Sequence, residues 1–124
     1  HPEKADPANR PAINKGIVIK FNAAQHYTTD AVSCAVYRDL CESNDIPVQV
    51  FTNRSDTRGG STLGNVSNAH VSLNTVDIGL AQLAMHSCYE TVGARDTKHL
   101  VDAMTIFYSK TFRVDAGGSF ELLD

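Results

Sequence analysis

Three short apolar runs, separated by stretches with helical spacing, constrain the fold of this chain most strongly. The runs cover residues 17–21, 48–51 and 76–79. Two of them are rich in Val, Ile and Phe, and all three are too short for helices, so they predict buried strands.

Helix signals lie between and after these runs. The cap-type residues Thr28-Thr29-Asp30 precede apolar residues at helical spacing, a short helix is predicted over 63–70, and Asp96 is predicted to cap a last helix. The apolar positions of the first of these helices are Val32, Ala35, Val36 and Leu40, and those of the last are Leu100, Met104, Phe107 and Tyr108.

Strands that alternate with helices are typical of an α/β fold with right-handed crossovers. We therefore predict a largely parallel sheet covered by helices. In such sheets ligands bind beyond the carboxyl ends of the strands. The loops 22–30, 53–64 and 79–90 are therefore expected to meet at one rim.

Composition excludes several classes of function. The chain has 124 residues, 42% of them hydrophobic, and a net charge of −3, which predicts one soluble domain. Eleven basic against fourteen acidic residues argue against nucleic-acid binding, and no apolar stretch is long enough to predict a membrane span. Three unclustered cysteines predict a reducing compartment, the cytoplasm, and neither a disulfide framework nor a thiolate zinc site.

We divide the chain into an extended lead-in over 1–15, an α/β region over 16–112 and a tail over 113–124. The lead-in holds three of the four prolines and no apolar period. Because it starts at His1 within a polar phrase, the chain is expected to be a piece of a longer protein.

The loop 54–64 contains Gly59-Gly60 and precedes a predicted helix, a pattern that favours anion binding by backbone N–H groups. No Lys stands beside its Ser and Thr residues, which argues against a nucleotide phosphate loop. A site for a peptide carboxylate or carbonyl and a tight connection without a ligand both remain open.

Three further residues have two interpretations each. His86 is a metal ligand or a structural histidine, and zinc needs three or four ligands that no spacing here supplies. Lys20, in an apolar strand, contacts a substrate carboxylate or lies exposed at an edge. Tyr27 donates a hydrogen bond at the same rim or covers the core. The seven-residue spacing of Cys34 and Cys41 predicts a buried helix face rather than a nucleophile.

Three phrases taken together resemble the aspartyl aminopeptidases and their bacterial relatives, which are dinuclear-zinc exopeptidases. They are Gly16 to Asp30 with Lys-Phe-Asn and Gln-His-Tyr-Thr-Thr-Asp, Asn53 to Gly64 with Gly-Ser-Thr-Leu-Gly, and Val76 to Glu90 with Gln-Leu-Ala-Met-His-Ser. The resemblance runs in order from about residue 1 to residue 112.

This resemblance implies the carboxy-terminal part of a catalytic domain with a three-layer α/β/α sandwich. His86 matches a zinc-ligand histidine, Lys20 and Tyr27 match substrate contacts, and Asp56 matches a supporting position near the site. The other ligands of the two zinc ions and the Glu base would lie before His1, together with a dimer-forming domain. The chain is thus expected to contribute to a homo-oligomeric aminopeptidase and to be inactive alone, with peptides as substrates.

Four positions depart from the family's usual residues, namely Ile17, His26, Asn65 and Tyr89, and they leave the substrate preference open. Two alternative functions remain. The chain is a non-catalytic α/β scaffold or binding module without a competent metal site, or a small nucleotide-binding protein.

Overall fold

A computed structural model describes residues 2–123, so His1 of the predicted lead-in and Asp124 of the predicted tail lie outside the described residues. After a 3-10 turn η1 (Pro2–Lys4), the central sheet is formed by β1 (Ile17–Phe21), β2 (Val48–Thr52) and β3 (Ile78–Gly79). The three helices are α1 (Ala31–Glu42), α2 (Leu63–His70) and α3 (Ala94–Ser109), and the two hairpins are β4 (Gln82–Leu83) with β5 (Thr91–Val92) and β6 (Thr111–Val114) with β7 (Phe120–Leu123).

The sheet is mixed, with the order β2-β1-β3. β1 and β2 are parallel, as predicted, with Ile17 opposite Val48 and Phe21 opposite Thr52. β3 is antiparallel to β1, with Ile78 opposite Ile19, so the prediction of a mostly parallel sheet is wrong for this strand.

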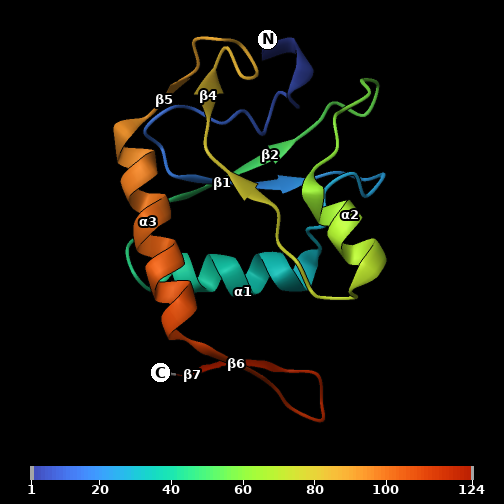
Figure 1. Cartoon of the computed structure of the whole chain (residues 1–124), viewed down its shortest axis with the longest axis vertical. Helices are drawn as coiled ribbons and strands as arrows, with labels where there is room; N and C mark the ends of the chain where they lie inside the picture. Colours follow the sequence, from blue (N-terminus) through green and yellow to red (C-terminus); the bar gives the residue numbers. More distant parts are fainter. Residues whose placement is uncertain (1, 124) are drawn as a thin grey trace.

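The length of α2 explains the reversal of β3. Eight helical residues span only about 12 Å, and α2 lies beside the end of the sheet rather than across its face (Figure 1). A parallel strand needs a crossover that returns the chain to the opposite end of the sheet, where the parallel strands begin. After α2 and residues 71–77 the chain is still at the carboxyl end of β1. The next strand therefore starts there and runs in the opposite direction.

The core lies between the sheet and the helices α1 and α3. Ile17 and Ile19 point from one face of β1 into this core and are fully buried. Their main partners from the helices and the following loop are Cys34, Tyr37, Leu40, Cys41, Ile46 and Ala103. α1 and α3 also contact each other, so the described residues form one helical layer on the sheet, and the third layer of the predicted sandwich is not shown.

The predicted helices are present, with differences at their ends and faces. Asp30 caps α1, and Cys34 and Cys41 lie on its buried face, as predicted. By contrast Val32 is exposed. The residue at the N-cap of α3 is Gly93, and Asp96 lies in the first turn instead of capping it.

Segments near both ends of the described residues also contribute to the fold. Asp6 N–H donates to the Thr52 carbonyl, and Ala5 bridges Asn53, so part of the lead-in lies along the edge strand β2. Within the predicted tail, residues up to 123 form most of the β6–β7 hairpin. No helix in the described part of the chain has the length and apolar character to cross a membrane.

Candidate functional site

A small polar cluster lies at the carboxyl end of β1 and contains Lys20, Tyr27 and Asp77. The Lys20 Nζ is 3.1 Å from Asp77 Oδ1 and 5.6 Å from the centroid of the Tyr27 ring. The structure therefore brings together the two residues predicted to contact substrate, and it adds a carboxylate that the sequence analysis did not assign to the site.

The turn after β1 returns Tyr27 toward the sheet. The Asn22 side-chain oxygen accepts hydrogen bonds from the backbone N–H groups of Ala24 (2.9 Å) and His26 (3.4 Å). Gln25 has a φ of 57°, which completes the reversal. Tyr27 is thereby buried, and its ring lies 6.3 Å from that of Phe51 in β2.

Besides its ion pair with Lys20, Asp77 forms several hydrogen bonds. Its backbone N–H donates to Thr29 Oγ1 at 2.7 Å, and its carbonyl accepts from the Lys20 backbone N–H at 2.9 Å. Thr62 Oγ1 donates to Asp77 Oδ2. A buried carboxylate is tolerated only when it is paired and hydrogen-bonded, and these contacts meet that requirement.

Two of the three loops predicted to meet at this rim do so. The Asn65 side-chain amide donates to the His26 carbonyl at 3.0 Å, and a Cβ on Gly64 would lie 2.8 Å from the Thr28 side chain. The third prediction, for 79–90, is wrong because β3 is antiparallel. Gly79 pairs with Val18, so the chain leads away from the rim, and the segment that precedes β3 joins the cluster instead.

The environment of the cluster changes the ionisation of Tyr27. Burial raises the pKa of its phenol above the usual value, and the negative charge of Asp77 raises it further. Tyr27 therefore stays protonated at neutral pH. One sequence signal could have identified Asp77: like Lys20, it is a charged residue within a predicted strand, and opposite charges on neighbouring strands favour an ion pair.

Asp56 lies outside this cluster. It is exposed and forms two hydrogen bonds with the Arg54 guanidinium, at 2.9 Å and 2.6 Å. These bonds and the Arg54 charge hold the pKa of Asp56 below its usual range. The contacts of Asp56 seen in the structure thus order the glycine-rich loop, and its predicted role beside a complete site stays a prediction.

His86 lies in the loop that joins β4 to β5 and is exposed. Its φ is 69°, and its backbone N–H donates to a carboxylate oxygen of Glu90. Because His86 is exposed, its imidazole lies outside the hydrophobic core, and a ligand shared with other groups has to lie outside the core as well. Within residues 2–123 no group of three or more His, Cys, Asp or Glu side chains could hold a metal ion. Residues 2–123 therefore do not form a complete zinc site by themselves, and the ligand role of His86 stays a prediction.

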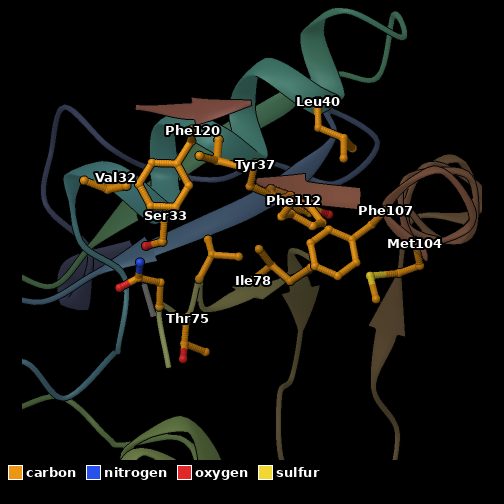
Figure 2. Close-up of a pocket in the computed structure, with 13 residues that line it drawn as sticks. Val32, Ser33, Tyr37, Leu40, Thr75, Ile78, Met104, Phe107, Phe112 and Phe120 are labelled. Carbon is orange, nitrogen blue, oxygen red and sulfur yellow. The ribbon is translucent and has the colours of Figure 1, made fainter. Parts of the chain in front are cut away.

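An apolar groove of about 420 Å³ lies between α1, α3, residues 74–78 and the C-terminal hairpin (Figure 2). Figure 2 shows Phe120 of the C-terminal hairpin beside Val32 of α1, and Phe112 of the same hairpin between Tyr37 of α1 and Phe107 of α3. None of the four predicted site residues lines this groove, so it is not the candidate peptide site.

The sequence as a whole matches one family. The model for the aminopeptidase I zinc metalloproteases (M18) matches residues 1–108. The probable M18 family aminopeptidase 2 of Clostridium novyi (strain NT) is 49% identical over 107 residues, which are 86% of this chain and 25% of that protein. The chain thus spans about a quarter of the length of this relative.

Solved structures agree with this match. The cryo-EM structure of the Ape4 and Nbr1 complex has a TM-score of 0.82 at 36% identity, over 87% of this chain and 21% of that one. The structure of the S. cerevisiae mApe1 dodecamer has a TM-score of 0.72 at 28% identity, over 85% and 22% of the two chains. The chain belongs to the M18 family of aminopeptidase I zinc metalloproteases.

Proposed function

We propose that this chain is the carboxy-terminal part of a zinc-dependent aminopeptidase that removes N-terminal residues from peptides. The observation that carries the proposal is the family match over residues 1–108 by a chain that spans a quarter of its relatives' length. The rest of the active site would then belong to the part of the enzyme that precedes these residues.

Lys20 and Tyr27 would contact the peptide. They lie together at the carboxyl end of β1, the usual position of ligands in α/β sheets, and a quarter of the Lys20 side chain is exposed. An ammonium at this position would attract an acidic N-terminal side chain. The phenol of Tyr27 would orient the peptide. Asp56 would act indirectly by keeping Arg54 and the glycine-rich loop in place.

His86 would be the one metal ligand that this chain supplies. Its exposed imidazole supports that role, and the remaining ligands of two zinc ions would come from the rest of the enzyme. When bound, zinc would polarise the scissile carbonyl and lower the pKa of a bound water toward about 7. The chain alone is therefore expected to be inactive.

A homo-oligomer in the cytoplasm completes the proposal. The dodecamer of the related mApe1 supports self-assembly. The three free cysteines, two of them buried, support a reducing compartment.

Zinc binding and peptidase activity test the proposal together. Calorimetric titration of the chain alone should show weak zinc binding, and the chain should not hydrolyse N-terminal Asp or Leu amides. Mixing it with the part of the Clostridium novyi relative that precedes the matching segment should give tight zinc binding and chelator-sensitive hydrolysis.

Variants of the chain identify the ligand. His86→Ala should abolish the activity of the mixture, whereas His70→Ala, which removes another exposed histidine, should preserve it. Chelator-sensitive turnover by the chain alone would show that it holds a complete site. If the mixture neither binds zinc tightly nor hydrolyses the amides, the alternative of a non-catalytic scaffold is favoured.

A further inference from the structure

We propose that Asp77 is the positioning residue for Lys20 and limits the preference of the site for acidic N-terminal residues. This inference rests on the proposed function, in which Lys20 contacts the substrate. It adds a second charged residue whose negative charge competes with the substrate for the same ammonium.

The contacts of Asp77 fix its carboxylate in place. The Asp77 side chain is 8% exposed, and the carboxylate shares its two oxygens between Lys20 Nζ, 3.1 Å from Oδ1, and the Thr62 hydroxyl at Oδ2. The backbone of Asp77 is bonded on both sides, to Thr29 Oγ1 and to the Lys20 N–H. The backbone bonds fix the point from which the side chain starts, and a rotation of the carboxylate away from Lys20 would break its bond from Thr62.

Lys20 is in turn confined to one position. The Tyr27 ring lies 5.6 Å from its Nζ. Gly79 makes room for the end of the side chain, because a Cβ at Gly79 would lie 2.9 Å from Lys20 Cε. With 25% of its side chain exposed, Lys20 remains accessible to a ligand while its ammonium stays paired.

This geometry has a consequence for specificity. A carboxylate of the substrate that reaches Lys20 meets a cation already neutralised by Asp77, so the gain from an acidic side chain is reduced. The loss of the Asp77 charge should strengthen that gain. The loss of the Thr62 hydroxyl should weaken it, because Asp77 would then interact more strongly with Lys20.

Peptide binding by the full 124-residue chain measures this preference. Asp-Ala-Ala amide and Asn-Ala-Ala amide differ in one ionised group, and NMR titration gives the ratio of their dissociation constants. We expect Asp77→Asn to raise the preference for the Asp peptide about tenfold over wild type, the size of one charged hydrogen bond. Thr62→Val should lower it; valine keeps the β-branched shape of threonine, and the Thr62 side chain makes no cap hydrogen bond in α2 that the variant would lose.

Asp102→Asn is the matched control, since it removes the same charge from the Lys98–Asp102 pair on the outer face of α3. Its peptide preference should equal that of wild type.

The ¹⁵N signal of the Lys20 ammonium provides a readout that needs no peptide. It should broaden or vanish in Asp77→Asn, while the Lys98 signal persists.

The outcomes separate this inference from the proposed function. If Lys20→Met abolishes the preference but Asp77→Asn and Thr62→Val leave it unchanged, the role of Asp77 is overturned and the substrate contact of Lys20 stands. If Lys20→Met retains the preference, the proposed substrate contact fails. A Lys20 signal unchanged in Asp77→Asn would overturn the positioning role whatever the peptides do.

Discussion

Asn14 donates its backbone N–H to Asp96 and so joins the lead-in to the first turn of α3. The Asn14 backbone N–H donates to Asp96 Oδ2 at 2.6 Å, and its side-chain oxygen accepts from the Arg95 backbone N–H at 3.1 Å. Asp96 Oδ1 accepts a further bond from Gly16 N–H at 2.8 Å. Asn14 thus caps a helix 80 residues away in the sequence, a function that Gly93 at the N-cap cannot perform.

Asp96→Asn should destabilise the fold by about 2–3 kcal/mol. The carboxylate is fully buried, and an amide would turn one acceptor into an NH₂ group facing a backbone donor. Urea unfolding of the chain, monitored by circular dichroism, measures the change. Asp102→Asn on the exposed side of the same helix should change the free energy of unfolding by less than about 0.5 kcal/mol. Equal effects of the two variants would contradict the anchoring role of Asp96.

Gly16→Ala should be more damaging than Gly60→Ala. Gly16 has a φ of +109°, and a Cβ there would lie 2.1 Å from the Pro47 carbonyl oxygen, which is backbone and cannot move aside cheaply. Strain in this region costs about 1–3 kcal/mol before the clash is added. We expect a loss of at least about 3 kcal/mol, by the same urea method.

Gly60 is the control for that prediction. A Cβ at Gly60 would meet nothing within 4 Å, and its φ is not positive. Gly60→Ala should leave the midpoint of unfolding nearly unchanged. If both alanine variants behaved alike, the close approach of Gly16 to Pro47 would not be a determinant of stability.

The sequence predicted the elements of this fold better than their directions. The local spacing of apolar residues is enough to place α1, and Asp30 indicates where this helix begins because the capping interaction is local. The direction of β3 depends on the end of the sheet at which the chain emerges from α2, and hydrophobic periodicity does not encode this position. The partner of Asp96 was likewise not predictable, since its contacts lie about 80 residues away.

The candidate site was predictable to the same extent. Lys20 lies in β1 and Tyr27 follows this strand, seven residues later, so their contact at one rim follows from local structure. Asp77 joins them only because β3 pairs antiparallel with β1, a non-local event. For His86 the structure gives an exposed loop position, and its role depends on groups beyond this chain.

The three thiols should differ sharply in reactivity. Cys88 is exposed, whereas Cys34 and Cys41 are buried between α1 and the sheet. Burial raises the pKa of Cys34, and it raises that of Cys41 to about 11, which suppresses the reactive thiolate. A disulfide reagent at pH 8 should therefore titrate one thiol in the native chain and three in urea.

Cys88→Ser identifies the fast thiol, because the native variant should then show no rapid reaction. Rapid modification of two or more thiols in the native wild type would contradict the packing of α1 against the sheet.

Asp30→Ala should destabilise the chain by about 1 kcal/mol at pH 7, because it removes the cap of α1. Asp30 accepts from Ser33 N–H at 2.7 Å, and the Ser33 hydroxyl accepts from Asp30 N–H at 3.0 Å. The first of these bonds lowers the pKa of Asp30 in the folded state. A lowered folded pKa means that the stabilisation is complete above the unfolded pKa of about 3.9 and is lost as the pH falls through the folded value. The difference between wild type and Asp30→Ala, measured by urea unfolding, should therefore shrink below pH 4.

Asp39→Ala, at an exposed position of the same helix, should show no comparable loss at pH 7. A difference for Asp30→Ala that stays constant from pH 7 to pH 2 would mean that the ionised carboxylate contributes nothing to the cap.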